Sequence, residues 1–231
     1  MKATRSVSLA AGLVIGVVAG ILFQREGVVR KMAAMMGEAR VPALSPHQRS
    51  RIETLRSLPV PDGAVVFLGD SLLDSQEWHE VFGNAKVLSR TVSGATSRDL
   101  SGLADFSNAA AVFCLVGTND AGYNVSTTEF TANYRKLLDE MPEEAKVFLI
   151  SIPPIRMHGG HSVDVRTLTR LNDAIRQLAD SKGFDFLDLY AAFGGADGFF
   201  ADDGLHLSPA GYECFLKIAG PAARAALSHH K

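Results

Sequence analysis

Between residue 61 and the C-terminus, short apolar runs alternate with longer segments of helical character. The first run, residues 65–68, contains β-branched and aromatic side chains and is closed by a glycine, which is typical of a strand buried on both faces. Regular alternation of this kind predicts an α/β fold with a five-stranded parallel sheet that helices cover on both faces. We expect strands at residues 65–68, 86–89, 111–116, 146–152 and 185–189, and helices at residues 75–82, 97–106, 127–141, 163–182 and 209–227.

The composition fits one such domain with an N-terminal extension. The chain has 231 residues, of which 47% are hydrophobic and 21% charged, so it can bury a sizeable core. A net charge of −2 and the lack of a dense Lys/Arg run argue against a nucleic-acid partner. The cysteines, Cys114 and Cys214, form no CxxC motif. Cys114 lies in an apolar run, which indicates a buried free thiol, although the sequence alone leaves a disulfide between the two open.

The N-terminus carries a basic start followed by an uncharged stretch. Lys2 and Arg5 precede residues 6–23, which are mainly apolar and of a length at the short end of a membrane span. We therefore expect residues 1–23 to form an apolar helix that anchors the protein in a membrane, with the domain outside the cytoplasm, in the periplasm or at the cell surface. Secretion after cleavage of a signal peptide is the alternative, but Val17-Val18-Ala19 is a poor cleavage site.

Residues 24–60 are expected to join this segment to the α/β domain at residues 61–231. The first part, up to residue 46, is interpreted as a linker. Residues 47–58 carry the sparse apolar residues Ile52, Leu55 and Leu58 at three-residue spacing, which predicts a surface helix that ends before a proline.

The stretch Gly69-Asp70-Ser71 follows the first predicted strand directly. Ser71 therefore lies where a parallel strand gives way to a helix, at the end of the sheet where open α/β folds bind ligands. Its hydroxyl is a possible nucleophile, and its backbone N–H is a possible donor to a developing negative charge. Taken alone, the tripeptide is more typical of a plain turn in which Asp70 or Ser71 caps a helix.

Three further stretches fall at strand ends or in the loop before the last helix. Residues 93–96 contain Gly94, whose backbone can approach a ligand closely. Residues 116–120 contain Asn119, whose side-chain amide can point into the same crevice. Residues 203–209 contain Asp203 and His206, which one turn can bring into contact because they are three positions apart.

These residue types fit nucleophilic catalysis. A serine hydroxyl needs a neutral imidazole to accept its proton, and the imidazole needs a partner that fixes its tautomer. His206 and Asp203 can fill these two roles. The amides of Ser71 and Gly94 and the side chain of Asn119 would give three donors to a tetrahedral intermediate, each worth roughly 3–4 kcal/mol of the barrier. Each residue alone is a weak signal, and their joint order is the specific one.

The four stretches resemble the conserved blocks of the SGNH, or GDSL, hydrolase superfamily. Ser71, Gly94, Asn119 and His206 match the four name residues, and the segment 203–207 with Gly211-Tyr212 matches the last block. The resemblance covers about residues 65–227. One departure is the segment Ser89-Arg90-Thr91, where many members carry Asn-x-Gly.

The resemblance implies a flavodoxin-like three-layer α/β/α sandwich and hydrolysis of carboxylic esters. It implies Ser71 as nucleophile, His206 as base and Asp203 as its orienting partner, with an oxyanion hole from Ser71, Gly94 and Asn119. It implies no metal and no organic cofactor.

The substrate is left open at this point. The lack of an obvious long apolar lid favours short acyl groups, such as acetyl on a carbohydrate, while the expected anchor favours a lysolipid. Acyl transfer to a cell-envelope glycan would use the same site. A non-catalytic binding module is disfavoured because no triad member is missing. His158 and His161 are interpreted as part of a loop at the crevice rim rather than as metal ligands, and Trp78 as a core residue. The oligomeric state is not predicted.

Overall fold

The structure is a computed structural model that describes residues 41–195 and 197–229. The predicted apolar helix at residues 1–23 and most of the predicted linker lie outside these residues. Arg40–Lys231 forms one compact unit. Among the described residues, no helix has the length and apolar character needed to cross a membrane.

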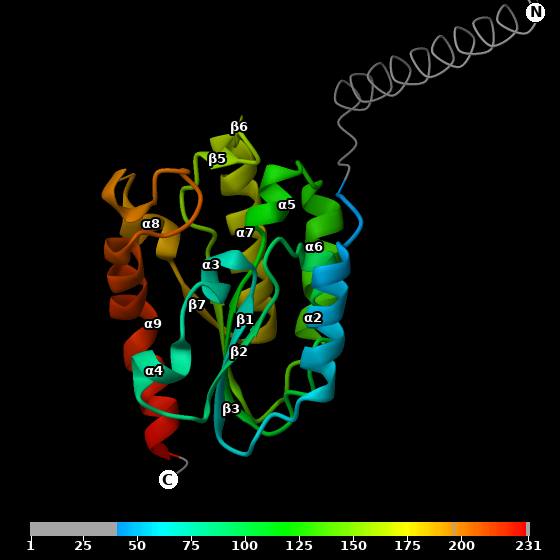
Figure 1. Ribbon diagram of the computed structural model, residues 1–231, viewed down its shortest axis with the longest axis vertical. Helices are drawn as coiled ribbons and strands as arrows, with labels where there is room; N and C mark the ends of the chain where they lie inside the picture. Colours follow the sequence, from blue (N-terminus) through cyan, green and yellow to red (C-terminus); the bar gives the residue numbers. More distant parts are fainter. Residues whose placement is uncertain (1–40, 196, 230–231) are drawn as a thin grey trace, which may run out of the picture. The chain divides into compact units, whose positions relative to one another are not determined.

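A five-stranded sheet forms the centre of this unit (Figure 1). Its strand order is β2-β1-β3-β4-β7, and all neighbouring strands are parallel, which is the flavodoxin-like arrangement. The predicted parallel sheet is therefore confirmed, with boundaries shifted by at most two residues at a strand end. The strands are β1 (Ala64–Gly69), β2 (Val87–Thr91), β3 (Ala109–Leu115), β4 (Lys146–Ile150) and β7 (Asp185–Leu187).

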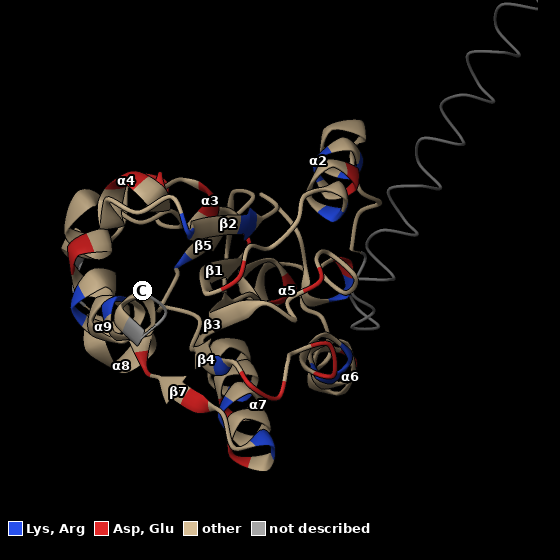
Figure 2. Cartoon of the chain, turned by 90° about the horizontal axis from the view of Figure 1, so that it is seen from below, with Lys and Arg blue, Asp and Glu red and all other residues tan. Residues whose placement is uncertain are grey.

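Helices cover both faces of the sheet, as Figure 2 shows. One face carries α6 (Thr127–Leu138) and α7 (Val165–Lys182), with α2 (Pro46–Ser57) on the same side near β2. The other face carries α9 (Pro209–His229) together with the short helices α4 (Trp78–Phe82) and α8 (Leu189–Phe193). Sequence patterning explains these layers, because the strands in the middle are apolar throughout while α7 buries only one stripe of residues.

The core contains stacked aromatic rings around the two central strands. Phe67 stacks on Trp78 with ring centroids 4.2 Å apart, and Phe113 stacks on Phe148 at 4.5 Å. Trp78 is only 1% exposed and donates its indole N–H to the Leu73 carbonyl at 2.7 Å, which confirms it as a core residue. Cys114 is buried, and both cysteines are free thiols.

Two predicted helices differ from the structure. The helix expected at residues 97–106 is wrong: only a 3₁₀ helix, η1 (Ser97–Asp99), forms there, and Gly102 adopts φ +70°, which ends any helical path. Leu100, Leu103 and Phe106, which are three residues apart in the sequence, are nevertheless buried, so in this segment a loop rather than a helix face provides the burial. Of the helix expected at residues 75–82, only the last five residues form one, α4, and a separate short helix, α3 (Ser71–Asp74), lies before the expected range.

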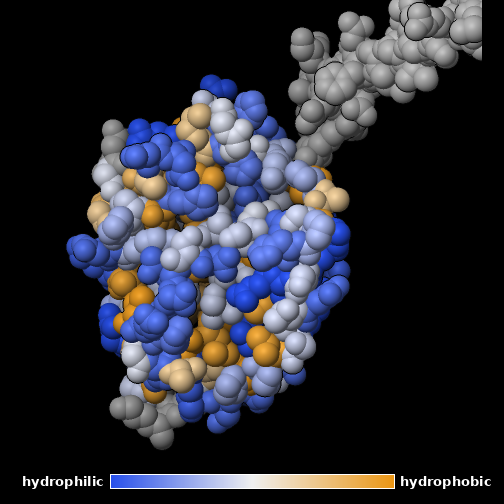
Figure 3. Space-filling view, in the orientation of Figure 1, coloured by the Kyte–Doolittle hydropathy of each residue, from blue (hydrophilic) through white to orange (hydrophobic). Residues whose placement is uncertain are grey.

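The predicted surface helix at residues 47–58 is confirmed as α2. It starts one residue earlier, because Pro46 occupies the first turn and Ser45 and Gln48 form a capping box. Figure 3 shows that the face seen in Figure 1 is largely hydrophilic, with a patch of hydrophobic residues in its lower half.

Candidate active site

Ser71 is the first residue of α3 and follows β1 after a single residue. Asp70 caps this helix by accepting the backbone N–H of Leu72 at 3.1 Å. Gly69 is required by a close approach: a Cβ there would lie 2.1 Å from the backbone oxygen of Leu115 on β3. The strand-to-helix turn therefore packs tightly against the neighbouring strand and holds Ser71 at the carboxyl end of the sheet, as predicted.

The structure brings Ser71, His206 and Asp203 into one hydrogen-bonded chain. His206 Nε2 lies 3.1 Å from Ser71 Oγ, and His206 Nδ1 lies 2.6 Å from Asp203 Oδ2. The second carboxylate oxygen of Asp203 accepts the backbone N–H groups of Leu205 and His206, both at 2.9 Å. These bonds fix the carboxylate, which in turn fixes the imidazole with Nε2 facing the serine.

Asp203 carries its charge at neutral pH. Its partial burial by itself would raise the pKa, but the hydrogen bond from His206 and those from two backbone N–H groups outweigh this effect and hold the pKa of Asp203 below its ordinary value. An ionised Asp203 is a hydrogen-bond acceptor, so it favours the His206 tautomer that carries its hydrogen on Nδ1 and presents Nε2 as the acceptor to the Ser71 hydroxyl.

Asn119 lies in α5 (Thr118–Gly122), which follows β3, and its side chain is 5% exposed. Its Nδ2 donates to the carbonyl of Ala95 at 2.8 Å. Ala95 follows Gly94, which adopts φ +77° and thereby turns the loop after β2 towards this side chain. The second and third sequence blocks are thus in direct contact at the same end of the sheet as Ser71.

Comparison with known proteins agrees with this geometry. The GDSL-like Lipase/Acylhydrolase family profile matches residues 67–214, more than half of the chain. The chain belongs to this family. A search of curated proteins gives no match.

Solved structures of GDSL-type and related proteins share the fold. A GDSL-like lipase from Bacteroides thetaiotaomicron is 21% identical with a TM-score of 0.64, over 78% of this chain and 98% of the other. A lipase/acylhydrolase from Enterococcus faecalis is 22% identical with a TM-score of 0.58, over 73% and 97%. A carbohydrate acetylesterase family member from Sinorhizobium meliloti is 16% identical with a TM-score of 0.53, over 71% and 99%.

Sequence reasoning on the GDSL-like chain missed the residue that connects α3, which begins at Ser71, to the loop after β2. Asp74, at the end of α3, accepts the hydroxyls of Thr91 at 2.5 Å and Ser93 at 2.6 Å. Thr91 belongs to the segment that departs from the usual Asn-x-Gly. The departure itself was the available signal, because a threonine at that position supplies a hydroxyl that glycine lacks.

His158 is the second residue whose role the sequence did not reveal. It lies in a two-strand hairpin, β5 (Met157–His158) and β6 (His161–Ser162), at the upper end of the compact unit in Figure 1. Its Nε2 is 2.9 Å from Asn119 Oδ1. The segment interpreted as a rim loop is therefore an ordered turn with a direct contact to a predicted site residue. Among the residues that the structure describes, no cluster of three or more metal-ligating side chains occurs.

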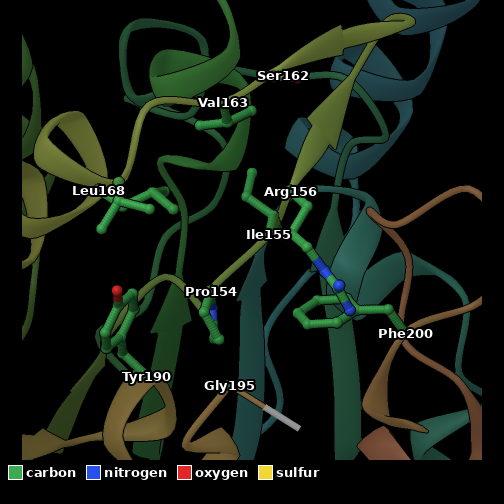
Figure 4. A pocket seen from close by; sticks show the side chains of 10 residues that line it. Pro154, Ile155, Arg156, Ser162, Val163, Leu168, Tyr190, Gly195 and Phe200 are labelled. Carbon is green, nitrogen blue, oxygen red and sulfur yellow. The ribbon is translucent and has the colours of Figure 1, made fainter. Parts of the chain in front are cut away.

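A pocket of about 430 Å³ lies beside the loop that carries His206 (Figure 4). Ser71, His206 and Asn119 are not among its lining residues. The pocket is connected to the loop through Arg156, which lines the pocket and donates its backbone N–H to the Gly204 carbonyl at 3.1 Å. Side chains at its lining include Ile155, Leu168, Tyr190 and Phe200.

Proposed function

We propose that this GDSL-like family member is a serine esterase that hydrolyses carboxylic esters through an acyl-enzyme on Ser71. The observation that carries the proposal is the hydrogen-bonded chain from Ser71 Oγ through His206 to Asp203, with separations of 3.1 and 2.6 Å. Both distances lie within the range for proton transfer between a nucleophile, its base and the group that orients the base.

The reaction would run in two halves. In the first, Ser71 Oγ attacks the ester carbonyl while His206 Nε2 takes the serine proton; His206 then gives this proton to the leaving alcohol, and the acyl group stays on Ser71. In the second, a water molecule attacks the acyl carbonyl and His206 again takes a proton. The proton returns to Ser71 as the carboxylic acid leaves.

The tetrahedral intermediates of both halves carry a negative oxygen. The backbone N–H groups of Ser71 and Gly94 and the Nδ2 of Asn119 are our proposed donors to this oxygen. The contact of Asn119 with Ala95 supports the set, since it places the amide beside the loop that contains Gly94. Donors that are held in place before the reaction stabilise developing charge without reorganisation.

For the substrate we favour short acyl groups, such as acetyl on a carbohydrate. Among the described residues, the hairpin near Asn119 has two strands of two residues each, which is too short for a long apolar lid. A lysolipid is the competing substrate because of the expected membrane anchor. Transfer of the acyl group to a glycan hydroxyl instead of water would use the same acyl-enzyme.

Kinetics on p-nitrophenyl esters of increasing chain length test the proposal. We expect the highest kcat/KM for acetate or butyrate and loss of turnover in Ser71→Ala. A Ser71→Ala variant that matches the wild type on every ester would rule out Ser71 as nucleophile. A preference for long chains would favour the lysolipid, and product analysis with and without a glycan acceptor separates transfer from hydrolysis.

A further inference from the structure

We propose that His158 is a positioning residue that holds the Asn119 side chain with its N–H group facing the oxyanion. The inference rests on the proposed esterase function and extends it to the hairpin β5–β6. It starts from the contact of 2.9 Å between His158 Nε2 and Asn119 Oδ1, which joins two residues 39 positions apart in the chain.

The two ends of an asparagine amide have almost the same shape but opposite chemistry. The NH₂ end donates two hydrogen bonds and the oxygen end only accepts. A rotation of 180° would therefore turn a donor in the oxyanion hole into an acceptor that repels the developing charge. The orientation of the Asn119 amide decides whether the site stabilises or opposes the intermediate.

The two neighbours of the amide define its orientation together. The Ala95 carbonyl can only accept, so it requires Nδ2 at 2.8 Å. Asn119 Oδ1 then faces His158, so the His158 Nε2 must carry a hydrogen and donate it. One Nδ2 hydrogen is given to Ala95, and we assign the second to the oxyanion. In a chain of hydrogen bonds each donor polarises the next, so the His158 N–H also makes Asn119 a stronger donor.

The structure around His158 holds the ring in this place. A Cβ on Gly122 would lie 2.1 Å from His158 Cγ, so the ring rests directly on the backbone at the end of α5. The Tyr123 ring packs edge-on against it, with centroids 4.8 Å apart. Asn119 and Gly122 belong to α5, and Tyr123 caps its C-terminus. This one short segment therefore carries the Asn119 amide and also the surface on which the His158 ring rests.

The ring is also suited to act as a neutral donor. Burial lowers the pKa of His158, and the nearby His161 and His206 rings add to the effect. A neutral imidazole with its hydrogen on Nε2 donates a hydrogen bond to Asn119. Because the ring is uncharged, it does not attract the oxyanion away from the proposed donors.

The test compares two histidines of the same hairpin in the full-length protein, with p-nitrophenyl acetate as substrate. His158→Phe keeps the ring and removes the donor; we expect kcat to fall about tenfold or more, less than the 10²–10³-fold typical for loss of an oxyanion donor, with KM nearly unchanged. His158→Gln, which restores an N–H near Nε2, should recover most of the loss. His161→Phe is the matched control, because His161 is exposed, and it should behave as the wild type.

A double-mutant cycle separates positioning from a general effect on folding. In Asn119→Ala the amide is absent, so adding His158→Phe should change kcat less than about twofold. Gly122→Ala is a second route to the same defect, because the added methyl displaces the His158 ring, and it should lower kcat only when Asn119 is present.

The results separate this inference from the proposed function. If Ser71→Ala keeps ester hydrolysis, the function fails. If Ser71 is essential but His158→Phe has wild-type kcat, or if the His158 and Asn119 effects multiply independently, only the positioning role is overturned. If His158→Phe does not fold, Gly122→Ala and Asn119→Ala serve in its place. Effects of these two changes on kcat that multiply independently would overturn the positioning role.

Discussion

Asp203 illustrates how one exposed side chain can be placed with accuracy by its neighbours in sequence. One of its oxygens takes two backbone N–H groups within its own turn, and the other takes the His206 ring at 2.6 Å. The turn therefore makes the carboxylate and the imidazole a single unit. Helix α9 begins three residues after His206 and holds this unit next to the sheet.

Replacement of Asp203 by asparagine should lower kcat/KM for p-nitrophenyl acetate by about 10³–10⁴, because an amide allows the imidazole to present the wrong tautomer to Ser71. Thermal stability should change little, since Asp203 is exposed. Asp202→Asn, one residue earlier and also exposed, is the control. Equal activity of the two variants would contradict the orienting role.

Asp70 is a residue with a different effect, on stability. It is fully buried, burial raises its pKa to about 7, and its Oδ2 has no hydrogen-bond partner among the described residues. The unfolded chain releases this proton near pH 3.8, so between roughly pH 4 and 7 the folded protein binds more protons than the unfolded one. The free energy of unfolding contributed by Asp70 therefore falls as the pH rises through this window.

Asp70→Asn should remove this contribution. Relative to the wild type, the variant should gain about 2–3 kcal/mol of unfolding free energy on going from pH 5 to pH 8. Urea unfolding of both proteins at the two pH values measures the difference. Asp62→Asn, at an exposed position, should show no such gain. An identical pH slope for Asp70→Asn and wild type would show that Asp70 is not protonated in the folded state.

Helix α2 contributes to the site although it precedes the region that the family profile matches. Gln48 donates from Nε2 to the Ser93 carbonyl at 2.9 Å, and Arg51 donates to the Thr91 carbonyl at 3.3 Å. On the other side of this loop, Asp74 of α3 accepts the hydroxyls of the same two residues. The loop that contains Gly94 is thus held between α3, which begins at Ser71, and α2, which lies outside the residues that the family profile matches.

Gln48→Glu tests this support with little change to α2 itself. Glutamate keeps the acceptor that closes the capping box with Ser45 but replaces the donor to Ser93 with a repelling oxygen. Loss of one such bond corresponds to a decrease in kcat of about 2–10-fold with Tm nearly unchanged. Glu53→Gln, at an exposed position on the same helix, should match the wild type. A Gln48→Glu variant with normal kcat would show that the loop needs no support from α2.

At the scale of the whole molecule, the chain divides into a compact unit from Arg40 onward and an N-terminal sequence outside the described residues. All the site contacts above are made inside the compact unit. The apolar sequence of residues 6–23 still predicts membrane attachment. The two parts should therefore be separable.

A protein that starts at residue 41 should keep kcat and KM for p-nitrophenyl acetate within about twofold of the full chain, since additive behaviour is expected for independent parts. After cell fractionation and carbonate extraction, the full chain should stay with the membranes and the truncated chain should be released. Release of the full chain by carbonate would contradict membrane attachment through the N-terminal sequence. A large loss of activity on truncation would show that the compact unit does not function independently of that sequence.

The amino-acid sequence was enough to predict the parallel sheet and the places of Ser71, Asp203 and His206 at strand ends and before the last helix. These depend on apolar runs, on local turn chemistry and on residues that lie at strand ends, so a short window contains the necessary information. It misjudged residues 97–106, because the spacing of Leu100, Leu103 and Phe106 is the same for a helix and for a buried loop that turns at Gly102.

The side chains that support the site could be identified only from the three-dimensional fold. The contacts of His158 with Asn119 and of Gln48 with Ser93 join residues 39 and 45 positions apart. The Asp74 contacts likewise join the ends of two different strand–helix units. The physical reason is that a hydrogen bond between distant segments leaves no periodic pattern in either segment, and it exists only once the sheet has brought the carboxyl ends of its strands together.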